Sequence, residues 1–328
     1  MKKILFLLPF LIPFLAMSAQ HTIFAHGITD GPQQMQRFQE ALATPHTTAI
    51  QFPDAQPASD WGLNNVTYQI TSLLGKKVNR NAMFMGQGAD IAIIFDAIDQ
   101  IPPTSLNILY GCSRGAAAIL TYLGQHNPAN IAAIVLDACP ANLPETMQSK
   151  LAHLGIAPSM ANSIFNALFP KYNPQTALTP EMAITQIQNK NIPILLIHSI
   201  CDNTVHYTHS LRLYQQFIKA GFTDVHLVLL PIGRHSYLLQ NPLVHPKYLQ
   251  AVHSFYKKYN LKHNPAWALP EIPATTLSSE MIDQQIKDYE RDIKIKYLQA
   301  FKRNITIAQA LMMLLVYYLY PSPIFFRG

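Results

Sequence analysis

A serine flanked by two glycines is the residue of this sequence whose chemistry is easiest to infer. The segment Gly111-Cys-Ser113-Arg114-Gly115 has the spacing G-x-S-x-G, directly after the apolar run 106–110 and before an alanine-rich stretch. In such a context the serine lies on a sharp turn between a strand and a helix, and the free N–H groups of the helix N-terminus favour negative charge beside its Oγ. The pattern predicts that Ser113 is a nucleophile.

A serine hydroxyl is a weak nucleophile, so a base and an orienting acid are needed. Asp202 follows the apolar run 194–198, and His235 follows the run 225–230. Because the carboxyl ends of parallel strands meet at one edge of a sheet, we expect Ser113, Asp202 and His235 to lie together there. Asp137, which ends the run 131–136, is the alternative acid. We expect it instead to cap or hydrogen-bond near the edge of the sheet.

Acyl transfer also needs N–H groups that stabilise the negative oxygen of the transition state. We expect one from the backbone of Arg114, which follows the serine. The other is expected from Ile28, because His26-Gly27 ends the apolar run 21–25 and the glycine permits a sharp turn. For the Arg114 side chain two interpretations stay open, a contact with an acidic group of the substrate and a salt bridge under the cap.

Together, His26-Gly27, the segment 111–115, Asp202 and His235 resemble the α/β-hydrolase superfamily over residues 21–260. The segment 192–205 is similar to the acid-bearing strand of esterases and of prolyl-oligopeptidase-type peptidases. The resemblance implies a Ser-His-Asp hydrolase that needs no cofactor. We expect it to cleave an acyl ester or thioester of a small or lipid-like substrate. A peptidase or amidase of the prolyl-oligopeptidase type and a non-catalytic binding protein are the alternatives.

Metal binding is not expected, although three histidines lie near the predicted acid. His198, His206 and His209 lack the accompanying carboxylate or thiolate spacing of a metal site, and His206 and His209 fit a helix surface. The cysteines show no zinc spacing either. For Cys139 and Cys201, both a disulfide and buried free thiols are considered, and free thiols are favoured.

The scaffold that must position these residues is predicted from apolar runs that alternate with helical patterns. Such an alternation is typical of the α/β class, with a mostly parallel sheet of about six strands covered by helices on both faces. Strands are expected at 21–25, 47–52, 106–110, 131–136, 194–198 and 225–230, and helices near 88–100, 115–125 and 208–220. The hydrolase domain is expected over 20–260, with a helical cap insertion at 141–191, and a helical extension with an apolar tail over 261–328.

The N-terminus predicts export. Two lysines precede an apolar run at 4–17, and Ser18 and Ala19 follow near a cleavage point, so residues 1–19 read as a signal peptide. A periplasmic, secreted or membrane-associated protein is therefore expected. Of 328 residues, 49% are hydrophobic and 13% are charged, which excludes disorder as the main state. The net charge of +6 includes no basic block, so nucleic acid is a poor partner.

The tail predicts contact with a membrane surface. No charged residue occurs from Ile305 to Tyr320, and Lys302 and Arg303 precede this run while Arg327 follows it. At about 1.5 Å per residue the run reaches about 24 Å, which is short of a hydrocarbon core of about 30 Å. Interfacial insertion is thus favoured over a transmembrane helix. Packing of the tail on the domain, or a dimer, is the alternative.

Overall fold

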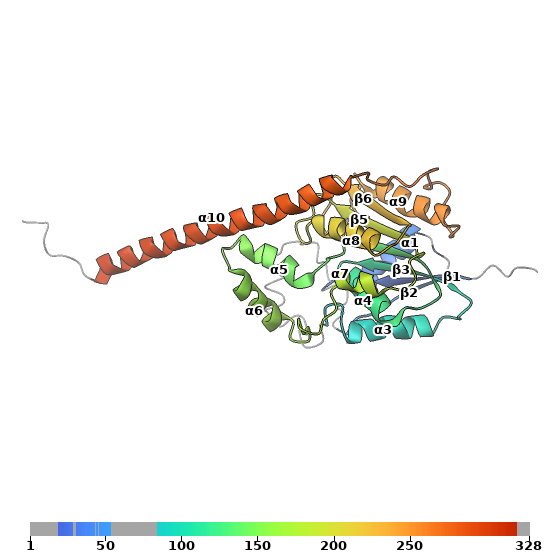
Figure 1. The fold of residues 1–328 in the computed structure, drawn as a ribbon, viewed down its shortest axis with the longest axis horizontal. Coiled ribbons are helices and arrows are strands. Elements are labelled where there is room, and N and C mark those ends of the chain that lie inside the picture. The colour runs from blue at the N-terminus through green and yellow to red at the C-terminus, as the bar shows by residue number, and fades with distance from the viewer. Residues whose placement is uncertain (1–18, 29–30, 43, 45, 54–83, 320–328) are drawn as a thin grey trace, which may run out of the picture.

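A single parallel sheet forms the centre of the molecule (Figure 1). The structure, a computed structural model, describes residues 19–28, 31–42, 44, 46–53 and 84–319. The predicted signal peptide, apart from Ala19, lies outside the described residues. The strand order is β2-β1-β3-β4-β5-β6. The strands are β1 (Gln20–Ala25), β2 (His46–Ala49), β3 (Leu106–Cys112), β4 (Ile131–Asp137), β5 (Ile194–Ser199) and β6 (Val225–Leu230).

Helices cover both faces of this sheet, because the strands are apolar on both faces. On β3, for example, Leu109 packs into the core on one face and Tyr110 into the core on the other. The first face carries α3 (Ala89–Asp99), α4 (Arg114–His126), α7 (Pro180–Gln186) and α8 (Thr208–Lys219). The second carries α1 (Pro32–Leu42) and α9 (His245–Lys258). The predicted parallel sheet of six strands is confirmed.

The strand predicted at 47–52 ends earlier than expected. β2 stops at Ala49, and the backbone N–H of Phe52 donates to Nε2 of His26 at 3.2 Å instead of to a neighbouring strand. The apolar side chain of Phe52 is nevertheless fully buried. The apolar run at 47–52 therefore predicted the burial of these residues correctly, but it overestimated the length of the strand.

The insertion 141–191 is helical, as predicted. It holds α5 (Leu143–Ala152), α6 (Pro158–Leu168) and α7. The side chains of Asn142 and Thr179 accept hydrogen bonds from the first turns of α5 and α7, and a proline opens each of the three helices, which explains where they begin. α5 packs on α6, whereas α7 packs between α4 and α8. Within the insertion, α5 and α6 thus stand outside the layer that covers the sheet.

The C-terminal extension first protects an edge of the sheet and then forms one long helix. Thr275 donates its N–H to the carbonyl of Leu227 and accepts from the N–H of Leu229, so it covers the free edge of β6. The helix α10 (Ser279–Leu319) has 41 residues. The sequence predicted a helical extension and an apolar tail. The two are continuous because neither glycine nor proline interrupts them.

The first part of α10 packs against the rest of the protein. It packs on α8 and α5, where Ile282 and Ala300 are buried, and its far end projects beyond α5 and α6 (Figure 1). Within the described part of the chain, no helix combines the length and the apolar character needed to cross a membrane.

A buried histidine ties the insertion to α8. Nδ1 of His209 accepts the N–H of Ala141 at 3.3 Å, and Nε2 lies 3.4 Å from Oγ1 of Thr146. The expectation that His209 lies on a helix surface is therefore wrong. Burial, followed by the cation of Arg212, lowers the pKa of His209 to about 3. Its ring is neutral in the folded protein at all but strongly acidic pH.

This histidine should make the protein less stable in acid. Between about pH 6.5 and about pH 3 the unfolded chain binds a proton at His209 that the folded chain does not, so the free energy of unfolding falls as the pH decreases through this window. The test is the free energy of unfolding, measured with urea at about pH 7.5 and at about pH 4.5. Between these two pH values, we expect the free energy of unfolding of His209→Gln to fall by about 2 kcal/mol less than that of the parent protein. His126→Gln, at an exposed position of α4, serves as the control. An equal loss in the parent and in His209→Gln would contradict this prediction.

Candidate active site

Ser113 occupies a strained turn between β3 and α4. Its backbone has φ 51° and ψ −116°, outside the regions that a residue with a side chain normally adopts. A Cβ on Gly111 would lie 2.5 Å from Cα of Ala116, and a Cβ on Gly115 would lie 2.2 Å from the carbonyl oxygen of Ala25. Both flanking positions therefore require glycine, which is the physical basis of the G-x-S-x-G spacing in this chain.

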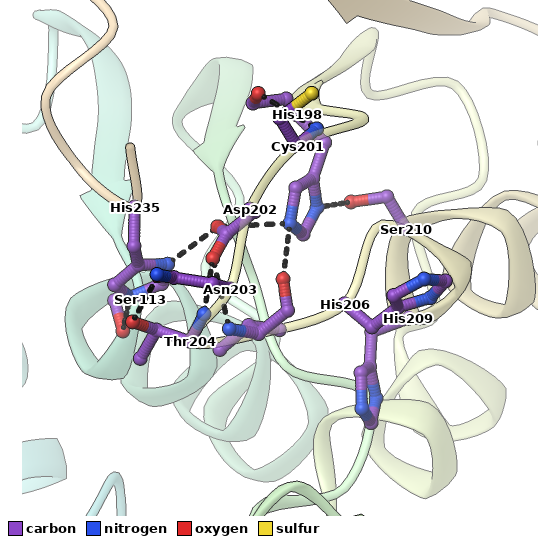
Figure 2. Close-up of polar contacts among 12 residues, drawn as sticks. Ser113, His198, Cys201, Asp202, Asn203, Thr204, His206, His209, Ser210 and His235 are labelled. Carbon is purple, nitrogen blue, oxygen red and sulfur yellow. Dashed lines mark hydrogen bonds and ion pairs between the residues drawn. The ribbon is translucent and has the colours of Figure 1, made fainter. Parts of the chain in front are cut away.

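The three residues that the sequence singled out lie together at the carboxyl edge of the sheet (Figure 2). Nε2 of His235 is 2.8 Å from Oγ of Ser113, and Nδ1 of His235 is 2.7 Å from Oδ2 of Asp202. A carboxylate only accepts, so the proton of a neutral His235 belongs on Nδ1. Nε2 is then free to accept the hydroxyl proton of Ser113.

Asp202 is held by its own loop, just beyond β5. Its Oδ1 accepts the backbone N–H groups of Thr204 and Val205 at 2.7 and 3.0 Å. Burial by itself would raise the pKa of Asp202, but His235, His198 and their hydrogen bonds hold the pKa well below its usual range. The carboxylate is therefore ionised at neutral pH.

A second histidine reaches the same carboxylate, which the sequence did not reveal. Nε2 of His198, at the end of β5, lies 2.9 Å from the carbonyl oxygen of Val205 and 3.2 Å from Oδ2 of Asp202. Its Nδ1 is 2.7 Å from Oγ of Ser210 on α8. The carbonyl can only accept, so in the neutral ring Nε2 carries the proton and Nδ1 accepts from Ser210. Figure 2 shows the resulting line of contacts from Ser113 to Ser210.

Asp137, the alternative acid, has different partners. Its backbone carbonyl accepts the N–H of Ser113 at 2.8 Å, while its side chain accepts from the hydroxyl of Tyr248 at 2.8 Å, which in turn contacts the hydroxyl of Tyr110. Complete burial raises the pKa of Asp137 to about 6, although the bond from Tyr248 opposes that shift. The side chain thus belongs to a buried network on the α1 and α9 face of the sheet.

The Arg114 side chain lies in the interior of the protein. It is fully buried, and its Nε and Nη2 donate to the two carboxylate oxygens of Asp90 at 2.8 and 2.7 Å. Its guanidinium also lies 4.7 Å from the ring centroid of Phe52. The interpretation as a substrate contact is wrong. A salt bridge is present, as the other interpretation expected, and its partner is Asp90 of α3. Asp90 also accepts the N–H of Gly86, so the pair fastens α3 and the preceding loop to the turn at Ser113.

The end of β1 lies against the start of α4. The tight approach of Gly115 to Ala25 and His26 brings the segment 26–28 beside the turn at Ser113. The N–H of Gly27 donates to Oε1 of Gln34, and Nδ1 of His26 is 2.8 Å from the carbonyl oxygen of Gly27. Burial lowers the pKa of His26 to about 4, so its ring stays neutral. Ile28, whose backbone N–H is the second expected oxyanion donor, follows directly in the chain.

The insertion packs against this same corner. A separate apolar cluster joins Ala117 of α4 and partly buried Ile28 to side chains from α5, α6 and the segment that follows α6. Its buried members are Met85, Ala117, Leu143, Phe165, Leu168, Phe169 and Tyr172. The insertion therefore contributes an apolar wall beside the segment that carries Ile28.

Among the described residues, the cysteine and histidine side chains form neither a metal-binding cluster nor a disulfide. No group of three or more His, Cys, Asp or Glu among them is arranged to bind a metal ion. None of the three cysteines forms a disulfide. Cys112 and Cys139 are buried, while Cys201, next to Asp202, is exposed, so the expectation of buried thiols is wrong for Cys201.

Comparison with known proteins agrees with this geometry. Residues 105–263 match the prolyl oligopeptidase family. The acylaminoacyl peptidase of Pyrococcus horikoshii has a similar structure, with a TM-score of 0.51 and 16% identity, over 81% of this chain and 40% of that one. An acylaminoacyl peptidase in complex with Z-Gly-Gly-Phe-chloromethyl ketone gives 0.50 and 14%, over 83% of this chain and 40% of that one.

The chain thus spans well under half of the peptidases that it resembles. The esterase Pf2001 of Pyrococcus furiosus is also similar, with a TM-score of 0.49 and 17% identity, over 74% of this chain and 82% of that one. No curated protein sequence gives a significant match. The sheet, the match of residues 105–263 and the turn at Ser113 agree with one another, and the chain has the α/β-hydrolase fold.

Proposed function

We propose that this protein hydrolyses acyl esters or thioesters through an acyl-enzyme on Ser113. The observation that carries the proposal is the hydrogen-bonded line Ser113–His235–Asp202, with Ser113 in a strained turn at the N-terminus of α4. A binding protein has no need of this arrangement, whereas a nucleophilic serine needs each part of it.

The proposed mechanism follows from the protonation state of His235. Oγ of Ser113 attacks the acyl carbon while Nε2 of His235 takes the hydroxyl proton, and the same nitrogen then donates it to the leaving group. Asp202 stabilises the imidazolium that forms. The backbone N–H groups of Arg114 and Ile28 donate to the developing oxyanion, aided by the dipole of α4. Water then attacks the acyl-enzyme with His235 as base.

Peptide or amide hydrolysis is the second candidate. It is favoured by the match of residues 105–263 to the prolyl oligopeptidase family and by the similarity to two acylaminoacyl peptidases. The same triad serves both reactions. The apolar wall from the insertion favours an apolar acyl group and hence the ester. Competition between an acyl ester and an acylated peptide for the same enzyme distinguishes the two candidates.

Removal of the nucleophile should abolish turnover without unfolding the protein. We expect Ser113→Ala to reduce the rate of p-nitrophenyl ester hydrolysis by about 10³-fold or more. The melting temperature should be nearly unchanged, because alanine keeps the Cβ and only the hydroxyl is removed. Ser163→Ala, at an exposed position of α6, should retain full activity. Substantial hydrolysis by purified Ser113→Ala would show that another group attacks the ester.

Replacement of the acid should distinguish Asp202 from Asp137. We expect Asp202→Asn to lower kcat by about 10³-fold or more, because an amide disfavours the His235 tautomer that can accept from Ser113. Asp137→Asn keeps an oxygen that can accept from Tyr248, so kcat should stay within about tenfold of the parent value. A greater loss of kcat in Asp137→Asn than in Asp202→Asn would assign the acid to β4.

The insertion should set the preference for acyl length. Met147, on α5, is partly buried against the apolar cluster near Ile28. We expect Met147→Ala to lower kcat/KM for an octanoyl ester by about tenfold, through loss of apolar contact, and to change kcat/KM for an acetyl ester by less than about twofold. Met182→Ala, at an exposed position of α7, is the matched control. Equal losses on both esters would mean that the insertion has only a structural role.

A further inference from the structure

The far end of α10 exposes apolar side chains to water on all sides. Asn304 makes a polar contact with the protein body, through its Nδ2 and the carbonyl oxygen of Leu154 at 2.9 Å. Beyond it, every described side chain of α10 is exposed. Leu311 is 60% exposed and Met313 is 74% exposed. Figure 1 shows this end of the helix projecting past α5 and α6.

The arrangement of these side chains excludes a partner that covers one face. At about 100° per residue, the apolar side chains of Ile305, Met313, Ile307 and Leu315 point in four directions that are about 80° to 120° apart. A second helix covers only a stripe of its partner, and the opposite side of a water-exposed helix is then polar. A helix that is apolar all round instead needs an environment that surrounds it, and the hydrocarbon of a lipid bilayer does so.

The charges at the start of this segment identify the type of lipid. Lys302 and Arg303 are the last charged residues before a stretch without charge that runs to the end of α10. Both are exposed, and neither forms an ion pair with any residue that the structure describes. Cations at the boundary between a polar and an apolar segment lie at the level of lipid headgroups, where anionic lipids attract them.

The length of the apolar segment indicates how deeply it can insert. From Ile305 to Leu319, 15 residues at about 1.5 Å each give about 22 Å, which is less than a hydrocarbon core of about 30 Å. The segment is therefore suited to insertion into one leaflet, tilted or along the interface.

We propose that the end of α10, from Ile305 onward, inserts into an anionic lipid bilayer and holds the hydrolase domain at the membrane surface. Lys302 and Arg303 then contact the headgroups. The inference is independent of the proposed catalytic chemistry, because none of these residues belongs to the site around Ser113. The partner of α10 is thus a lipid surface. A second copy of the chain would instead need an α10 whose apolar side chains lie on one face, with polar side chains opposite.

The test is co-sedimentation of the full-length protein with vesicles of phosphatidylcholine and phosphatidylglycerol in a ratio of about 3:1, compared with vesicles of phosphatidylcholine alone. We expect the parent protein to sediment with the anionic vesicles. A triple variant, Ile307→Glu with Leu311→Glu and Leu315→Glu, should remain in the supernatant. Lys302→Gln with Arg303→Gln should weaken binding to the anionic vesicles by about 30-fold and change binding to the neutral vesicles little.

Matched controls separate this effect from general changes of charge or folding. Leu243→Glu with Met182→Glu and Leu106→Glu places the same charges at exposed apolar positions of the domain, and this variant should sediment like the parent. Hydrolysis of a soluble acetyl ester and the melting temperature should be alike in all four proteins. Sedimentation of the triple α10 variant with the vesicles would overturn the proposal. The proposal would also be overturned if the parent protein does not sediment with vesicles, forms a dimer by light scattering, and loses that dimer in the triple variant.

Discussion

The backbone strain at Ser113 is the constraint on which the rest of the site depends. A φ of 51° at a residue with a side chain persists only where the surroundings enforce it. The enforcement comes from two glycines in contact with neighbouring backbone, from the N–H of Ser113 bound to the carbonyl of Asp137, and from the buried pair of Arg114 and Asp90. A buried, bidentate ion pair next to Ser113 is costly to break, since the arginine would be left unpaired in the core. The turn is thereby fixed before any substrate binds.

The acid side of the site is organised by donors that converge on one carboxylate. Asp202 accepts from two backbone N–H groups of its own loop, from His235 and, at a longer distance, from His198. Ser210 on α8 and the carbonyl of Val205 fix the ring of His198. The position of Asp202 is thus determined by a strand end, a loop and a helix together, and its negative charge is stabilised in a place from which water is largely excluded.

Much of this architecture was predictable because burial and turn geometry restrict the residue types at neighbouring positions of the sequence. Doubly buried strands read as apolar runs, and the glycines around Ser113 reflect contacts that permit no side chain. The pairing of Arg114 with Asp90, 24 residues earlier, could not be predicted from the local sequence. In a sequence, a buried aspartate on an apolar helix face cannot be distinguished from an aspartate on the surface. The contact of His198 with Asp202 likewise exists only after β5 and its loop have folded. Continuity of α10 was missed because a change of composition at Asn304 suggested a boundary that the backbone does not have.

The central claim is that the folded protein activates one particular hydroxyl, that of Ser113. Reaction of the native, full-length protein with a fluorophosphonate, followed by mass spectrometry of its peptides, tests this claim most directly. The account predicts a single adduct on the peptide that contains Ser113, formed by the native protein and not by the urea-unfolded chain. An adduct on another serine, or an equal reaction before and after unfolding, would contradict it.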